Sequence, residues 1–320
     1  MSERTIRLIR LPFSQNKLLV QLLLLLFILV LFSFLSPYFF TVTNFMNVFN
    51  QMVEVGLIAI PMTMIVISGA MDLSVGSILG FSAVCMGIAF EQGLNIWASV
   101  LVALVMGLLC GAVNGYLIAR HRMQAIVVTI GMLVMLRGLV YVLNEGRPIS
   151  GYPDSFYFLG QTYVAGVPFN AIFLAVLFLA ANFILKRTRF GTYVYGIGNN
   201  EEAVHYSGIS VVRTRMILFL LSGLFSAMAG VFLVSRLASA EATSGTNIEL
   251  DVLTATLIGG THIFGGRGSL SGTFVGLLII VFLRNGLNLL GVSVLYQAVI
   301  LGALLLIAVS NKPFKGRSSQ

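Results

Sequence analysis

Long apolar runs separated by short polar interruptions extend over almost the whole chain. A membrane-spanning helix needs about 20 predominantly apolar residues, and fewer where the helix is broken or buried among other helices. This pattern predicts ten spanning segments, at about residues 18–36, 53–70, 75–91, 96–119, 124–143, 169–186, 215–236, 252–265, 269–285 and 293–310. We therefore expect an all-α polytopic membrane bundle of about ten helices, some of them discontinuous; the type of the short, glycine-rich eighth segment is left open.

Two polar interruptions lie between neighbouring spans. The first, Ser68-Gly-Ala-Met-Asp-Leu-Ser-Val-Gly-Ser77, places Asp72 at membrane depth, where an ionisable residue costs about 2.5–3.5 kcal/mol on insertion scales and is usually functional. A second break, Gly259–Ser269, also combines glycines with Ser and another polar residue. Paired interruptions in the two halves of a transporter indicate its pathway. The alternative is that the glycines permit tight packing and that Asp72 or Ser74 caps the next helix.

Other polar residues inside the spans have two possible roles. Asn114, Asn285 and Asn288 either line a pore or form hydrogen bonds between helices. We expect Asp72 close to the inner face and Arg137 at a different depth, roughly 20 Å from the inner end of its helix. Arg137 then reaches the outer interface or a cluster of carbonyls, and Arg284 extends outward to water. The predicted pathway and gate residues are Asp72, Ser74, Gly76, Ser77, Gly259, Gly260, Thr261, Asn285 and Asn288.

Composition and charge support a membrane protein and predict its orientation. The chain is 58% hydrophobic and only 9% charged, against about 25% in a soluble domain. Its net charge of +8 is concentrated at both termini, at 120–122 and in 186–215, which the positive-inside rule assigns to the cytoplasm. We expect a cytoplasmic N-terminal segment (1–17), one permease domain (18–310, with a cytoplasmic segment 187–214) and a cytoplasmic tail (311–320). This basic charge does not indicate binding to nucleic acid.

The sequence contains no pattern for catalysis in this chain. The sequence has no Ser/His/Asp or paired-carboxylate arrangement of the kind used in catalysis, and no His/Cys/Asp cluster with metal-ligand spacing. It also has no G-x-x-x-x-G-K-[ST] motif, the loop that binds the phosphates of ATP. Cys85 and Cys110 lie inside apolar runs, as small core residues do. We therefore expect a non-enzyme without a cofactor or metal of its own.

The polar segment 186–215 contains the signals of a short helix. Asn199 or Asn200 is suited to its N-cap, Glu201 and Glu202 to its first turn, and Gly208 to its C-terminal end. The segment is either a solvated loop or a surface helix that docks into another protein.

Several motifs, in the same order along nearly the whole chain, carry a family resemblance. They are the first break, Gln124-Ala-Ile-Val-Val-Thr-Ile130 with Leu136-Arg-Gly138, Gly196-Ile-Gly-Asn-Asn-Glu-Glu-Ala203 with Ser207-Gly-Ile209, the second break, and Arg284-Asn-Gly-Leu-Asn-Leu-Leu-Gly-Val292. The chain resembles permease subunits of ATP-binding-cassette importers of the ribose/xylose/autoinducer-2 class, in the branched-chain amino acid and sugar permease superfamily. It is most similar to the ribose type. One departure is Ala70-Met71 before Asp72, where members often have Gly-Ile; the Asp, Ser and Gly positions are kept.

The resemblance implies a fold, a location and partners. The fold is a type II importer bundle with inverted repeats, in the bacterial inner membrane and in contact with lipid. The partners are a second permease copy or paralogue, a cytosolic ATPase that binds ATP and Mg, and a periplasmic solute-binding protein. The residues implied to couple to the ATPase are Gly198, Asn199, Asn200, Glu201, Glu202, Ala203, Ser207, Gly208 and Ile209.

We therefore expect the translocation subunit of an importer for a monosaccharide or similar small polar solute. An ion-gradient-driven secondary transporter that uses Asp72 is the alternative. A membrane scaffold without transport is a third class, and it gives no role to paired glycine breaks.

Overall fold

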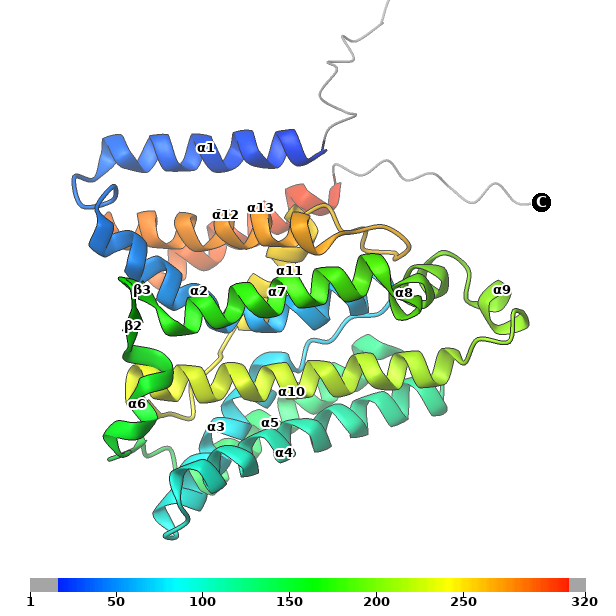
Figure 1. Cartoon of the computed structure of the whole chain (residues 1–320), viewed down its shortest axis with the longest axis horizontal. Coiled ribbons are helices and arrows are strands. Elements are labelled where there is room, and N and C mark those ends of the chain that lie inside the picture. The colour runs from blue at the N-terminus through cyan, green and yellow to red at the C-terminus, as the bar shows by residue number, and fades with distance from the viewer. Residues whose placement is uncertain (1–16, 311–320) are drawn as a thin grey trace, which may run out of the picture.

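The computed structural model describes residues 17–310, so most of the expected N-terminal segment and the whole expected tail lie outside the described residues. Thirteen α-helices and one π-helical turn account for most of this part (Figure 1). The helices are α1 (Lys17–Leu35), α2 (Val42–Ile67), α3 (Val75–Glu91), α4 (Ile96–Gly115) with η2 (Tyr116–Arg120), α5 (Ala125–Asn144), α6 (Asp154–Gln161), α7 (Phe169–Arg187), α8 (Arg189–Asn199), α9 (Glu201–Tyr206), α10 (Val211–Leu237), α11 (Ile248–Ile258), α12 (Leu270–Leu289) and α13 (Val294–Ser310).

The expected all-α membrane bundle is confirmed. Within residues 17–310, seven helices are long and apolar enough to cross a membrane, and α3 and α13 are shorter apolar helices. Lipid offers the backbone no hydrogen-bond partner, so an apolar segment must satisfy its own peptide groups by forming a helix. Together with the 11-residue α11, these helices match the ten predicted segments.

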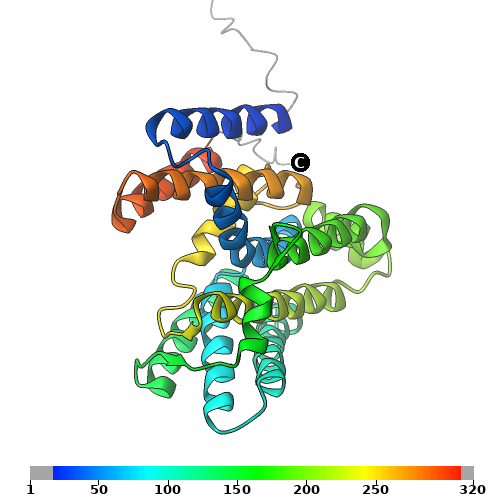
Figure 2. The same cartoon turned by 60° about the vertical axis from the view of Figure 1, so that its left-hand side comes forward.

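The helices form successive layers around α2. Figures 1 and 2 show α1 at one edge, next to α12, and α3, α4 and α5 at the opposite edge beneath α10. In α2, 89% of the most apolar window is buried, against 17% in α1. The apolar sequence of α1 therefore faces outward along most of its length, whereas α2 is the centre of the protein core.

Each end of the bundle has its own small elements. One end, which we call the α6 end, carries α6 with β2 (Tyr163–Val164) and β3 (Val167–Pro168). At the opposite end, called the α8–α9 end, α8 and α9 extend beyond the long helices (Figure 1). A second antiparallel pair, β1 (Ile149–Ser150) with β4 (Ser239–Ala240), joins the segments that follow α5 and α10.

Two predicted spans were wrong in their boundaries. The second span begins at Val42, not at residue 53, because Thr41 accepts a hydrogen bond from the Asn44 backbone and starts the helix earlier. The eighth was predicted at 252–265, but α11 ends at Ile258. Gly260 then has a φ of +89°, a conformation that ends a helix, and the following residues form turns.

The polar segment 186–215 contains two helices, one of which was missed. The short helix expected after Asn199 or Asn200 is α9, in which the Asn200 side chain accepts the Ala203 N–H at 3.0 Å. Gly208 follows it with a φ of +78°. The missed helix is α8, whose buried face includes Val194 and Ile197. Their spacing was a weak helical signal within a polar segment.

Candidate functional site

The first break turns back into the bundle after α2. The chain reverses at Gly69, which has a φ of +83°, and residues 70–74 run without regular structure to the start of α3. Asp72 is fully buried and accepts hydrogen bonds from Ser74 N–H at 3.0 Å, Ser74 Oγ at 2.6 Å and Ser222 Oγ at 2.7 Å. Because Ser222 lies near the middle of α10, Asp72 is at mid-depth. The expectation that Asp72 lies close to the inner face was wrong, because the chain re-enters the bundle before α3 begins.

A polar cluster around Asp72 joins three helices. The Ser74 hydroxyl donates to Asp72 and accepts a bond from Asn114 Nδ2 of α4 at 2.9 Å, while Ser222 comes from α10. The Ser77 hydroxyl donates to the Ser74 carbonyl at 2.7 Å. The Ser74 side chain therefore does not cap α3; Asp72 instead accepts the Ser74 backbone N–H just ahead of that helix.

A second re-entrant segment lies opposite the first. At 1.5 Å per residue, the 11 residues of α11 extend about 17 Å, roughly half of the hydrocarbon thickness. Residues 238–247 therefore enter the bundle from the α6 end, as the yellow segment of Figure 1 shows. A Cβ on Gly76 would overlap the Gly245 carbonyl oxygen and the Glu249 carboxylate. The first turns of α3 and α11 therefore meet at mid-depth.

The break at Gly259–Ser269 differs from the one at Gly69–Ser77, although the sequence pairs them. It connects α11 to α12 at the α8–α9 end, where the Gly266 N–H donates to the Ile67 carbonyl at 2.8 Å. Gly259 packs against the α12 backbone, since a Cβ there would lie 2.6 Å from Thr273 Cα. Thr261 is fully buried. The two breaks are in contact, but the structural counterpart of 70–74 is 238–247.

The expected coupling residues lie on α8 and α9 and just beyond them. Gly198 packs so closely on the end of α2 that a Cβ would overlap the Ile67 carbonyl oxygen. Asn199 Nδ2 donates to the Tyr195 carbonyl at 2.9 Å and lies 3.5 Å from the Gly266 carbonyl oxygen. Tyr195 itself donates its hydroxyl to the Gly268 carbonyl at 2.8 Å. Desolvation raises the pKa of Tyr195, so this hydroxyl keeps its proton. This end of α8 thus touches the end of α2 and the second break.

The α9 helix is exposed and fixed to α10. Glu201 forms a two-bond ion pair with Arg215, at 2.9 and 2.6 Å. The remaining members of the expected coupling set flank this pair or end the helix. Glu202 and Ala203 are exposed, Ser207 Oγ donates to the Ala203 carbonyl at 2.8 Å, and Ile209 N–H lies 3.4 Å from the Val204 carbonyl oxygen.

The remaining predicted polar residues have local partners. Asn285 exchanges two side-chain hydrogen bonds with Asn44 of α2, at 2.8 and 2.9 Å, which is the interhelical role. The exposed Asn288 accepts a bond from Gln297 Nε2 at 2.6 Å. Arg137 donates to the Ser244 carbonyl at 2.7 Å, as expected of a residue that seeks a carbonyl.

The sequence did not reveal the ion pair of Arg284. Its partly exposed guanidinium pairs at 2.7 Å with the buried Asp251 in the first turn of α11. A buried charge is stabilised by a partner of opposite sign, and Asp251 supplies it.

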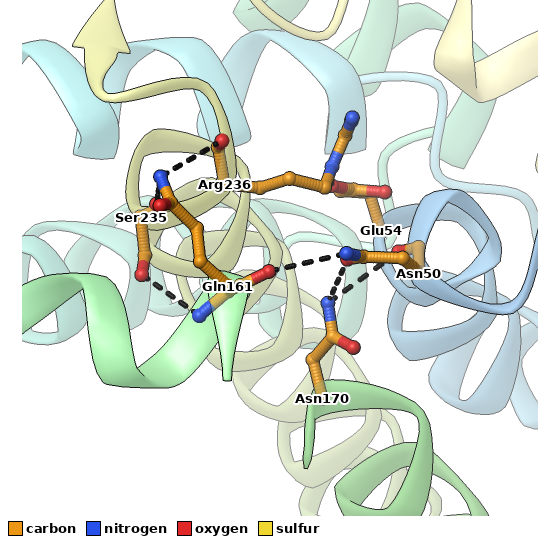
Figure 3. A network of polar contacts seen from close by, with 7 residues as sticks. Asn50, Glu54, Gln161, Asn170, Ser235 and Arg236 are labelled. Carbon is orange, nitrogen blue, oxygen red and sulfur yellow. Dashed lines mark hydrogen bonds and ion pairs between the residues drawn. The ribbon is translucent and has the colours of Figure 1, made fainter. Parts of the chain in front are cut away.

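Sequence reasoning missed a polar network near the α6 end (Figure 3). Its ion pair joins Arg236 of α10 to the buried Glu54 of α2 at 2.8 Å. The Asn170 side chain of α7 donates to Asn50, which donates to the Gly160 carbonyl of α6 at 3.2 Å. Further bonds from Gln161 reach the Ser235 and Arg236 carbonyls. Glu54, an acidic residue inside an apolar run, was the signal that could have revealed this network.

Metal-ligating side chains do not gather anywhere in residues 17–310, where no group of three or more His, Cys, Asp or Glu could hold an ion. The candidate site therefore consists of two re-entrant segments at mid-depth, and α8 contacts the end of α2 and the connection between α11 and α12.

Comparison with known proteins agrees with this architecture. The family described as "Branched-chain amino acid transport system / permease component" matches residues 44–309. The ribose import permease protein RbsC of Escherichia coli (strain K12) is 39% identical over 90% of this chain and 91% of its own length. RbsC of Bacillus subtilis (strain 168) is 41% identical over 89% of each chain. The autoinducer 2 import system permease protein LsrD of Klebsiella pneumoniae is 31% identical over 89% of this chain and 87% of its own.

No solved structure matches the chain. The family match nevertheless covers most of the described helices, and the relatives span nearly the full length. The chain belongs to the permease family of branched-chain amino acid transport systems, and it is a multi-pass membrane protein.

Proposed function

We propose that this chain is the membrane-spanning permease subunit of an ATP-binding-cassette importer for a monosaccharide, with ribose as the first candidate. Two observations on relatives support the solute: the RbsC proteins named for ribose import are 39% and 41% identical over about nine-tenths of the chain. LsrD, named for autoinducer 2 import, is less similar, at 31%. A similar small polar solute is the broader form of the proposal.

The orientation follows from charge. The α8–α9 end carries Arg120, Lys186, Arg187, Arg213 and Arg215, and we assign it to the cytoplasm by the positive-inside rule. The α6 end then faces the periplasm of a bacterial inner membrane. On this assignment a cytosolic ATPase, which binds ATP and Mg, docks at α9, and a solute-binding protein docks at the α6 end. A second permease copy or a paralogue completes the pathway.

The contact of α8 with the end of α2 and with the second break is the observation that carries the mechanism. Ile67 ends α2 and accepts the Gly266 N–H, while Tyr195 holds the Gly268 carbonyl at 2.8 Å. A displacement of α9 by the ATPase would pass through α8 to the ends of α2 and α11. Those helices lead to the mid-depth junction of Gly76 with Gly245. Movement at the ATPase would therefore open and close the re-entrant segments.

Reconstitution tests this function. The chain, its ATPase and its binding protein are placed in proteoliposomes with labelled ribose outside. We expect uptake only when all three proteins and ATP are present. Equal uptake without ATPase or binding protein would refute the proposal and favour the secondary transporter, for which the buried Asp72 is the candidate coupling group.

A further inference from the structure

A hollow of about 300 Å³ lies at the α6 end, beside the point where residues 238–247 enter the bundle. It is lined by Tyr141 of α5 and by residues of two connections, one after α5 and one after α10: Gly146, Pro148, Glu241, Ala242 and Thr243. This volume is at the lower limit for small-molecule sites. None of these residues belongs to the breaks or to the coupling segment.

Strand pairing builds this hollow. Ile149 of β1 faces Ala240 of β4, so the antiparallel register places Pro148 next to Glu241. Arg137 of α5 donates to the Ser244 carbonyl at 2.7 Å and fixes the re-entrant segment against the helix that carries Tyr141. The two lining segments are therefore held together by backbone and side-chain bonds on both sides of the hollow.

The lining has the chemistry that recognises a sugar. Tyr141 presents an aromatic ring that is 51% exposed, an apolar surface with a polar hydroxyl at its edge. Glu241 is exposed, and among the described residues only Thr243 donates to its carboxylate, at 3.3 Å. A carboxylate accepts about four hydrogen bonds, so most of its capacity is left for hydroxyl donors. A single carboxylate beside an aromatic ring suits a neutral polyol better than a metal ion, which prefers several oxygen ligands.

The hollow also adjoins the re-entrant segment 238–247. From Glu241 the chain leads within a few residues to Gly245, which packs on Gly76 at the mid-depth junction. A solute held at the hollow would stand at the outer mouth of the re-entrant segment.

We infer that this hollow is a transient monosaccharide-binding subsite of the permease itself, with Tyr141 stacking on the sugar ring and Glu241 and Thr243 binding its hydroxyls. The inference rests on the proposed sugar-import function and adds a solute contact to it. The site is open and has few polar groups, so we expect millimolar rather than micromolar affinity, as suits a site that must release its solute inward.

Thiol protection tests the subsite directly. A Thr243→Cys variant of the full complex is treated with a membrane-impermeant maleimide in the presence of ribose at 0 to about 100 mM, since millimolar affinity requires this range. We expect ribose to slow labelling at least about threefold, and a Glu145→Cys variant on the exposed connection after α5 to label at the same rate throughout. Labelling of Thr243→Cys that ribose leaves unchanged would overturn the inference, as would protection by unloaded binding protein alone.

Transport variants give the second readout. Tyr141→Ala and Glu241→Gln should each lower ATP-driven ribose uptake about fivefold at saturating loaded binding protein, without changing the affinity of the complex for that protein. Matched controls at the same end are Tyr163→Ala, an exposed tyrosine of β2, and Glu145→Gln. Full uptake by both hollow variants would overturn the subsite. Failure of the wild-type complex to take up ribose would refute the proposed function, while the thiol experiment would still decide whether the hollow binds a sugar.

Discussion

Replacing Asp72 separates a structural carboxylate from an ion-coupling one. Asp72 Oδ1 accepts two bonds from Ser74, and Oδ2 accepts one from Ser222. In Asp72→Asn the remaining oxygen keeps the two Ser74 bonds. The new amide faces Ser222, whose hydroxyl can rotate to accept. All three contacts survive, so we expect a loss of less than about 1 kcal/mol in stability.

Asp72→Ala removes all three bonds and leaves the Ser74 N–H without its acceptor. At about 0.6 to 1.5 kcal/mol for each bond, the three bonds together cost about 2–4.5 kcal/mol. The matched control is Ser82→Ala, because the buried Ser82 hydroxyl has no hydrogen-bond partner among the described residues. Its loss should be nearly neutral.

Thermal unfolding of the detergent-purified complex measures these changes, and uptake in proteoliposomes measures function. We expect Asp72→Asn to keep at least half of the ATP-driven uptake and Asp72→Ala to lower the unfolding temperature clearly. An Asp72→Asn protein with wild-type stability but no uptake would refute this reasoning. If a proton gradient also drove wild-type uptake, the charge itself would be essential and the secondary transporter would be the correct function.

Three further predictions concern contacts between helices. Glu54→Gln should destabilise the protein by about 2–3 kcal/mol, because it leaves the partly exposed Arg236 without its ion-pair partner. The double variant Glu54→Gln/Arg236→Gln should recover part of this loss. Strictly additive losses in this double-mutant cycle, measured by unfolding, would contradict the pairing. Asn285→Ala removes both bonds to Asn44 and should cost about 1 kcal/mol. Adding Asn44→Ala should then cost only its remaining side-chain bond to the Phe39 carbonyl, so the double variant should lose less than the sum of the two single variants; strictly additive losses would disprove the pairing. Tyr195→Phe removes the bond to the Gly268 carbonyl and should lower the ratio of solute moved to ATP hydrolysed about twofold. The control is Tyr193→Phe on the same helix, whose hydroxyl bonds to no described residue; it should leave the ratio unchanged. Equal ratios in both variants would argue against α8 as the link between the ATPase and the bundle.

Much of the fold was predictable because the signals are local. An apolar run in lipid must form a helix to satisfy its own backbone, whatever its neighbours are. Short-range caps were readable for the same reason: Asn200 and Gly208 delimit α9 through contacts a few residues away. The boundaries failed where tertiary packing decided them, as at α11, where glycine turns at the α8–α9 end replace a helix that hydropathy alone extends.

The site was only partly predictable because its partners are distant in sequence. The family motifs placed Asp72 and the coupling segment along the chain, but Ser222, which binds Asp72, is 150 residues away, and Arg236 is 182 residues from Glu54. The two glycine breaks are similar in local sequence, but the structure shows that their backbones have different geometry. No local pattern marks 238–247 as re-entrant, because its composition is that of an outer loop.

The sequence by itself thus determined the class of the protein, its membrane helices and the position of its motifs. Each of these depends on the contrast between apolar and polar residues over short distances, or on recognisable motifs. Only the tertiary structure decided which polar groups meet at mid-depth and that α8 contacts both the end of α2 and the second break. The physical reason is that irregular backbone and buried charge persist within a membrane only where surrounding helices satisfy them. Here those helices come from distant parts of the chain, so the packing, and not the local sequence, selects which polar residues meet inside the bundle.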